Sequence, residues 1–243
     1  FPGAKLDRQK EAPIRVLLAD DVSVAVVNGQ SMTLLNGNDP AFVPIALPPG
    51  HRFSISRSGV TYTVKDLEAE GSWQLKGPPV FASNDGNGIR LAEPANINRR
   101  YRGVLRFQAG RNNTVQVVNV LDVELYLLGT LPGDMPASWG VKAPTTRAAG
   151  AVALRSRALT QRKLDSAPFD FTASDPKYLG LDGERARTTR AVQKTRNLTL
   201  RKGTLPYPAS FSGTRVMGST AFQPRLGTPA PVAFGPTKAV EID

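Results

Sequence analysis

Residues 124–159 read ELYLLGTLPGDMPASWGVKAPTTRAAGAVALRSRAL, and this stretch decides the fold. In its second half, small apolar and arginine side chains fall on two different sides at helical spacing, so we expect the main helix at residues 146–163. The apolar run 121–131 is a second helix candidate. Two prolines restrict the backbone of residues 131–136, which predicts a tight loop between the two helices.

Working outward, the first hundred residues alternate short apolar runs with turn residues, which is typical of strands. Residues 14–18 read as a short buried strand. Hairpins are expected across Asn28-Gly29, Ser58-Gly59 and residues 110–113, because asparagine and glycine tolerate positive φ in tight turns. The sequence therefore predicts an α+β fold with a β-rich N-terminal half and a mixed α/β core that carries one main Ala/Arg-rich helix.

Three regions follow from this pattern. Residues 14–96 form a β-rich N-terminal region, and residues 97–221 form the core with the candidate active site. Residues 222–243 are rich in proline and glycine, show no periodicity, and are expected to be an extended tail. The chain has 243 residues, enough for one large or two small domains.

The charge is unevenly distributed between these regions. Residues 1–96 carry nine Lys/Arg and ten Asp/Glu, whereas residues 97–243 carry 22 Lys/Arg and ten Asp/Glu, within an overall charge of +11. A strongly basic half suggests a polyanionic partner such as nucleic acid, an anionic wall polymer or stem-peptide carboxylates. A basic surface with no dedicated partner is the other interpretation.

Several kinds of chemistry are excluded by composition. The chain has no cysteine, which removes disulfides, Cys-ligated zinc and thiol catalysis. Its one histidine, His51, follows a Pro-Pro-Gly turn and is expected to be a solvated turn residue, so no His triad or multi-His metal site can form. We expect no metal, no cofactor and no membrane span, because no apolar run approaches 18 to 20 residues.

The central stretch resembles the stage II sporulation protein D / LytB amidase-enhancer family. That family has an acidic-Tyr-Leu segment, a Pro-x-Glu-Met-Pro-x-x-Trp loop and a helix with an Ala-Val-Ala-x-Arg core. Here residues 124–127, the loop 132–139 and the helix core 151–155 fall in register. Weaker likeness extends over most of residues 14–220.

The resemblance implies a protein that acts on the glycan strands of peptidoglycan, either as a lytic transglycosylase or as an amidase enhancer. The transglycosylase reaction needs one carboxyl group. It protonates the leaving glycosidic oxygen and then accepts a proton from the muramyl 6-hydroxyl as that hydroxyl attacks the anomeric carbon, so no water is consumed. Such an acid requires an apolar setting that keeps it protonated.

Asp134 stands where the family has its catalytic glutamate. Aspartate is one methylene shorter, and a misplacement of about 1 Å can cost on the order of 100-fold in rate. Three interpretations stay open: Asp134 is a working acid, a relic in a binding-only protein, or a turn-forming residue after Gly133. The family's helix Lys and Gln are replaced by Ala148 and Gly150, which points towards weakened catalysis.

The other candidate site residues are substrate-binding. Arg155 either binds a substrate carboxylate or braces the Asp134 loop by an ion pair. Tyr126 and Trp139 either pack in the core or stack on sugar rings. Ser212 and Thr214 are candidate hydrogen-bonding partners of glycan hydroxyls. Some relatives carry a Cys/His zinc site after the helix, but residues 169–178 contain neither residue type.

Three functions therefore compete. The first is a wall protein that binds glycan strands and cleaves the bond between N-acetylmuramic acid and N-acetylglucosamine. The second is a non-catalytic peptidoglycan-binding enhancer of an N-acetylmuramoyl-L-alanine amidase. The third is a basic module for anionic polymers, although no nucleic-acid-binding motif is present. The first two imply an extracytoplasmic location, in the periplasm or cell wall, with any signal peptide removed or outside this chain.

Overall fold

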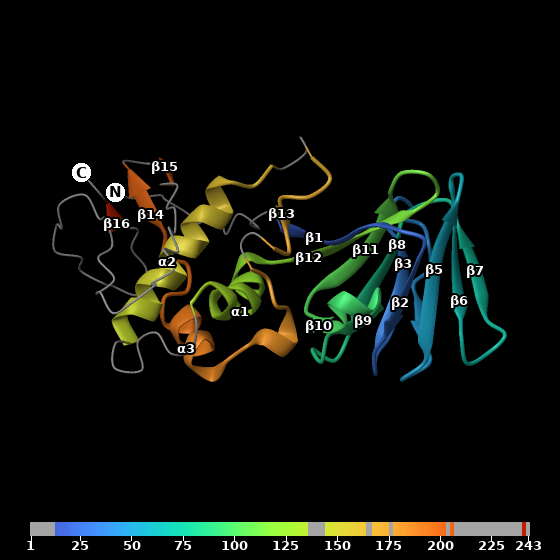
Figure 1. Ribbon diagram of the computed structural model, residues 1–243, viewed down its shortest axis with the longest axis horizontal. Coiled ribbons are helices and arrows are strands. Elements are labelled where there is room, and N and C mark those ends of the chain that lie inside the picture. Colours follow the sequence, from blue (N-terminus) through green and yellow to red (C-terminus); the bar gives the residue numbers. More distant parts are fainter. Residues whose placement is uncertain are drawn as a thin grey trace, which may run out of the picture.

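The computed structural model describes residues 13–135, 144–163, 167–174, 177–202, 205–206 and 240–241. Along the long axis of the molecule, a β unit of two sheets occupies one end and the helices occupy the other (Figure 1). The expected α+β class with a β-rich N-terminal half is confirmed. None of the helices in the described ranges has the length and apolar character of a membrane span.

The larger sheet has seven strands. In spatial order they are β13 (Phe171–Thr172), β1 (Ile14–Val22), β12 (Val115–Leu121), β11 (Val104–Ala109), β8 (Pro79–Ser83), β3 (Met32–Asn36) and β4 (Ile45–Leu47). All neighbours are antiparallel except β1 and β13, which are parallel. Strands from both sides of residue 96 therefore share one sheet, and the division into regions 14–96, 97–221 and 222–243 stays a prediction.

The second sheet has six antiparallel strands. They are β10 (Arg99–Tyr101), β9 (Ile89–Glu93), β2 (Val24–Asn28), β5 (Arg52–Ser58), β6 (Thr61–Asp66) and β7 (Ser72–Leu75). Apolar side chains alternate with exposed ones along these strands, as expected for sheets with one buried face. Contact between the rings of Phe53 in β5 and Phe81 in β8, 6.4 Å apart, joins the two sheets in one core.

Two of the three expected hairpins are confirmed. Strands β5 and β6 pair across Gly59, which has a φ of 58°, and β11 pairs with β12 across a loop in which Asn112 and Asn113 have positive φ. The prediction of a hairpin across Asn28-Gly29 is wrong. Strand β2 pairs with β5 and β9, whereas β3 pairs with β4 and β8, so this turn carries the chain from one sheet to the other.

The helical end contains α1 (Val123–Asp134), α2 (Pro144–Thr160) and α3 (Ala186–Lys194). Two short 3-10 turns, η1 (Ala95–Ile97) and η3 (Leu181–Gly183), and the small sheet β15 (Leu205–Pro206), β14 (Leu200–Lys202) and β16 (Val240–Glu241) complete the described elements. Helix α1 follows β12 directly, because the side chain of Asp122 accepts a hydrogen bond from the Leu125 amide and caps the helix.

The expected loop at residues 131–136 is wrong in its first part, because α1 continues to Asp134 with Pro132 inside it. A proline in the last turn removes a single helical hydrogen bond, and the Met135 amide still closes the turn on the Leu131 carbonyl at 2.9 Å. The main helix forms as expected, with its start at Pro144 and its end at Thr160.

Candidate functional site

The C-terminal half of α1 lies against the backbone of residues 177–180. Gly129 and Gly133 are four residues apart and share one face of the helix. A Cβ at Gly129 would lie 2.7 Å from the Tyr178 ring, and one at Gly133 would lie 2.2 Å from the Lys177 carbonyl oxygen. The amide of Leu179 donates to the Gly129 carbonyl at 2.9 Å. Glycine at both positions is therefore what permits this close approach.

Asp134 is the last residue of α1 and is half-buried. Its Oδ1 accepts a hydrogen bond from the backbone amide of Lys177 at 3.2 Å. This contact fixes the carboxyl group at the seam between α1 and the 177–180 segment. The turn-forming interpretation of Asp134 thus has a concrete partner, and its catalytic role stays a prediction.

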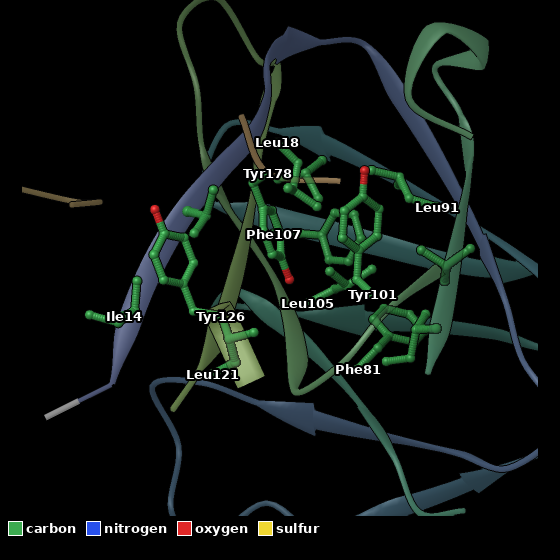
Figure 2. Packing of buried hydrophobic residues seen from close by; sticks show 14 of the residues in the cluster. Ile14, Leu18, Phe81, Leu91, Tyr101, Leu105, Phe107, Leu121, Tyr126 and Tyr178 are labelled. Atoms are coloured by element: carbon green, nitrogen blue, oxygen red, sulfur yellow. The ribbon is translucent and has the colours of Figure 1, made fainter. Parts of the chain in front are cut away.

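Tyr126 lies in the core near Tyr178 and Tyr101 (Figure 2), and with Phe171 these residues form a stack of four neighbouring rings. Its ring lies 5.7 Å from Phe171 and 5.6 Å from Tyr178, and Tyr178 lies 5.9 Å from Tyr101. Because Tyr126 is only 1% exposed, the structure places it in packing contacts rather than at a surface where a sugar ring could stack. The stack joins α1 to β10 and β13.

Burial raises the pKa of two tyrosines in this stack. The pKa of Tyr101 rises to about 12, and that of Tyr178 lies well above the usual value. Both hydroxyls are therefore protonated at neutral pH. Tyr178 donates its proton to Oδ1 of the fully buried Asn119 at 2.7 Å, which ties the 177–180 segment to β12.

Arg155 has a partner that neither sequence-based alternative named. Its guanidinium is 1% exposed and binds both carboxylate oxygens of Glu124, at 2.7 and 2.8 Å. It also donates to the carbonyls of Val192 and Leu198. One arginine of α2 thereby connects the first turn of α1 with the last turn of α3.

This position keeps Arg155 away from Asp134. Glu124 lies in the first turn of α1 and Asp134 is ten residues further along. A helix rises 1.5 Å per residue, so the two carboxylates are separated by about 15 Å along the axis. Arg155 therefore stabilises the frame of the helical end and does not brace the aspartate.

Three predicted site residues, Trp139, Ser212 and Thr214, lie outside the described residues. Their roles stay predictions. The part of the predicted loop that follows Met135 also lies outside the described residues. The described part of the candidate site is thus the end of α1, the 177–180 segment that it contacts, and the surfaces on either side.

Two cavities flank the end of α1. One, of about 480 Å³, is lined by Pro132, Met135 and Leu179 together with three arginines from α2 and the start of α3: Arg147, Arg185 and Arg187. The other, of about 510 Å³, is lined by Lys177, Leu179 and residues of β1, η1, β10 and the β13 loop. Asp134 is in neither lining, but Met135, the next residue, lines the first cavity, and Lys177, whose amide donates to Asp134, lines the second.

Two acidic residues in and after η3, Asp182 and Glu184, are bound by arginines. Asp182 accepts hydrogen bonds from Arg100 at 2.7 and 2.9 Å, and Glu184 accepts from Arg102 at 2.6 and 3.1 Å. Burial raises the pKa of Asp182, but the bonds from Arg100 outweigh that effect and leave the pKa lowered. These carboxylates therefore hold η3 against the β unit.

His51 is not a simple solvated turn residue, so that expectation needs correction. Its Nδ1 lies 2.9 Å from Oδ2 of the buried Asp66, and its ring lies over Phe53. With Glu68 the pair brings three potential ligand atoms within 4.8 Å. Glu68 is already bound by Arg52 and Asp66 by the Glu68 amide, so these groups serve to close the β5–β6 hairpin.

Arg185 and Arg187 belong to the Arg-rich segment 185–202, which in the sequence favours an anionic partner. Nothing in the sequence pattern marked Glu124 as the partner of Arg155. A pairing between residues 31 positions apart depends on how the helices pack, which periodicity does not report.

Fold and site together define an α+β protein in which a three-helix end is built on the edge of a two-sheet β unit. This end carries a half-buried carboxyl group next to residues that line two cavities. Residues 111–201 match the family model SpoIID, described as Stage II sporulation protein. The match covers the segment from the loop before β12 to β14, and the similarity to this family rests on that segment. Comparison with curated proteins and with solved structures gave no match. A SpoIID segment suggests a peptidoglycan-related role.

Proposed function

We propose that this protein binds the glycan strands of peptidoglycan at the C-terminal end of α1, outside the cytoplasm. The observation that carries the proposal is the position of Asp134. By the resemblance it occupies the position of the family's catalytic glutamate. Its sequence neighbour Met135 lines a cavity of about 480 Å³, and its hydrogen-bond partner Lys177 lines one of about 510 Å³. Cavities of this size are typical of sites that hold small-molecule groups.

The chemistry of the cavity walls suits an acidic sugar polymer. Pro132, Met135 and Leu179 offer apolar surface, and three arginines offer hydrogen-bond donors with positive charge. Sugar rings have apolar faces and hydroxyl edges, and muramyl residues add carboxylates. A wall that is both apolar and cationic therefore suits an acidic sugar polymer better than it suits a neutral ligand.

Cleavage of the strand is the second candidate, and the resemblance to the family's catalytic glutamate makes Asp134 the proposed acid. Glu124, Asp182 and Glu184 are each committed to an arginine. In the proposed step, Asp134 gives its proton to the oxygen that leaves C1 of N-acetylmuramic acid. The muramyl 6-hydroxyl attacks C1, its proton passes to the carboxylate, and a 1,6-anhydro ring closes.

In this account Arg155 is a positioning residue. Its bonds to Glu124 and to the Val192 and Leu198 carbonyls hold α1 and α3 in place, so that the end of α1 faces the first turn of α3 across the arginine-lined cavity. Tyr126 contributes in the same way through its ring contacts with Phe171 and Tyr178.

The experiment is co-sedimentation of the full chain with purified peptidoglycan, followed by mass spectrometry of the supernatant. Wild type is compared with Asp134→Asn and with Glu70→Gln, a matched carboxyl-to-amide change at an exposed turn of the β unit. Binding predicts that all three proteins sediment with the wall. Cleavage predicts anhydro-muramyl products from wild type and Glu70→Gln and none from Asp134→Asn.

The outcomes separate the candidates. Sedimentation without soluble products identifies a binding module, the role expected of an amidase enhancer, and addition of an N-acetylmuramoyl-L-alanine amidase then tests for increased release of stem peptides. A chain that stays in the supernatant at physiological salt contradicts the proposal as a whole.

A further inference from the structure

The arginine-lined cavity collects positive charge from two separate elements. Arg147 comes from the start of α2 and is nine-tenths buried, whereas Arg185 and Arg187 come from the start of α3 and are exposed. No acidic residue is among the described residues that line the cavity. A wall of this kind attracts an anion strongly, because its charges act together on one enclosed space.

The neighbouring acids are directed elsewhere. Asp182 and Glu184 come shortly before Arg185 in sequence, but their side chains bind Arg100 and Arg102. Arg185 instead donates to the carbonyls of Asp182 and Glu184, at 3.1 and 2.8 Å. Arg187 has no hydrogen-bond or ion-pair partner among the residues that the structure describes. The carboxylates of Asp182 and Glu184 are thus bound by arginines outside the cavity lining, and the charged residues among the described lining are all arginines.

We infer that this cavity is a subsite for a carboxylate carried by the glycan strand. The inference rests on the proposed function and adds the chemical group that the site selects. Guanidinium groups form paired, charge-assisted hydrogen bonds with carboxylates, and the two exposed ones of Arg185 and Arg187 at one cavity favour a carboxylate over a neutral acetamido sugar. Pro132 and Met135 line the same cavity and offer apolar surface to the sugar that carries the carboxylate.

Two sources of such a carboxylate occur on a wall strand. In a strand without stem peptides, the lactyl group of each N-acetylmuramic acid ends in a free carboxylate. In a strand with stem peptides that group is an amide, and the carboxylates belong to the peptide. The chemistry at the arginines is the same in both cases, so comparison of the two strands identifies the source.

The test is calorimetric titration of the full chain with three soluble ligands of equal length. They are peptide-free glycan strands, peptide-bearing glycan strands, and N-acetylglucosamine oligomers, which have the same backbone without carboxylates. Each ligand is titrated into wild type, into Arg185→Gln/Arg187→Gln, and into the control Arg190→Gln/Arg196→Gln. The control removes the same charge from exposed positions outside the cavity lining.

We expect wild type to bind at least one carboxylate-bearing strand about tenfold or more tightly than the neutral oligomer. The cavity variant loses that preference and keeps its affinity for the neutral oligomer, whereas the control variant keeps the preference. Equal affinity for acidic and neutral strands overturns the inference and leaves the proposed function standing, as does an equal loss in both variants. Absence of binding to every strand rejects the proposed function, and the inference with it.

Discussion

Arg155 and Glu124 form the ion pair that holds the helical end together. The charges suit the helix ends they contact, because Glu124 lies in the first turn of α1 and the guanidinium meets carbonyls at the end of α3. Arg155 uses donors on all three of its nitrogens in these bonds. Loss of either partner would leave a charge in the interior without its counter-ion.

We expect Glu124→Gln to lower the free energy of unfolding by about 3 kcal/mol or more, since an uncompensated buried guanidinium remains. Urea denaturation measures the change. The matched control is Glu68→Gln, which removes the partner of the exposed Arg52 and is expected to cost much less, because solvent screens an exposed pair. Similar small losses in both variants would show that the buried pair contributes little.

The Asp170 carboxylate predicts a pH dependence of stability. Burial by itself raises its pKa, but hydrogen bonds from the side chain and amide of Arg15 and from the Lys163 amide outweigh burial and leave the pKa below the ordinary aspartate value of 3.8. The folded state therefore binds this proton less readily than the unfolded state. Its contribution is complete above the ordinary value and is lost as the pH falls through the folded pKa.

Urea midpoints measured between about pH 5 and pH 2.5 test this dependence. Wild type is expected to lose stability as the pH falls through that range. Asp170→Asn is expected to be less stable than wild type at pH 5 but to lose less stability on acidification, because it has one fewer carboxyl group to protonate. Parallel curves for the two proteins would contradict a lowered pKa at Asp170.

At the scale of elements, the glycine face of α1 sets the position of the candidate acid. Glycine in a helix interior costs about 1 kcal/mol relative to alanine, so a helix keeps it only where a side chain would collide. Gly129 and Gly133 both lie against the backbone or ring of the 177–180 segment, and Asp134 follows at the same seam.

The effect of Gly133→Ala on stability is therefore expected to be opposite to the gain that helix propensity predicts. The added Cβ would overlap the Lys177 carbonyl, so we expect the protein to be destabilised by about 1 to 3 kcal/mol. The loss is measured from the thermal unfolding of the variant. Arg190→Ala, on the exposed face of α3, is the control for the effect of alanine in a helix. A more stable Gly133→Ala protein would mean that the 177–180 segment can move away from α1 at little cost.

Sequence reasoning succeeded for local elements and failed where partners are distant. Ser58-Gly59 predicted the β5–β6 hairpin because the turn and both strands are contiguous. Asn28-Gly29 carries an equally clear turn signal, yet β2 and β3 enter different sheets, since each buries its apolar face better against strands that come later in the chain. A turn motif reports a change of direction and leaves the pairing undetermined.

The candidate site was predictable to a similar degree. The family resemblance selected Asp134, and the basic half of the chain signalled an anionic partner. The roles of Arg155 and Tyr126 were left between alternatives, because the burial of each depends on α3 and on the 171–178 segment, which follow in the chain and pack back onto α1.

At the scale of the whole molecule, the β unit supports a helical end that carries the site. Strands β1 and β12 pair along their length, from Ile14–Leu121 at the helical end to Val22–Val115, and α1 begins one residue after β12. Ion pairs of Arg100 and Arg102 with η3 add a second connection. The candidate glycan site is therefore expected to respond to a ligand while the far strands of the β unit do not.

The most direct test is hydrogen–deuterium exchange of the full chain with and without soluble glycan strands. We predict slower exchange with ligand in residues 129–135 and 177–188, at the end of α1 and around the start of α3, and unchanged exchange in residues 52–75. Slowed exchange confined to β5, β6 and β7, with the end of α1 unaffected, would contradict the account.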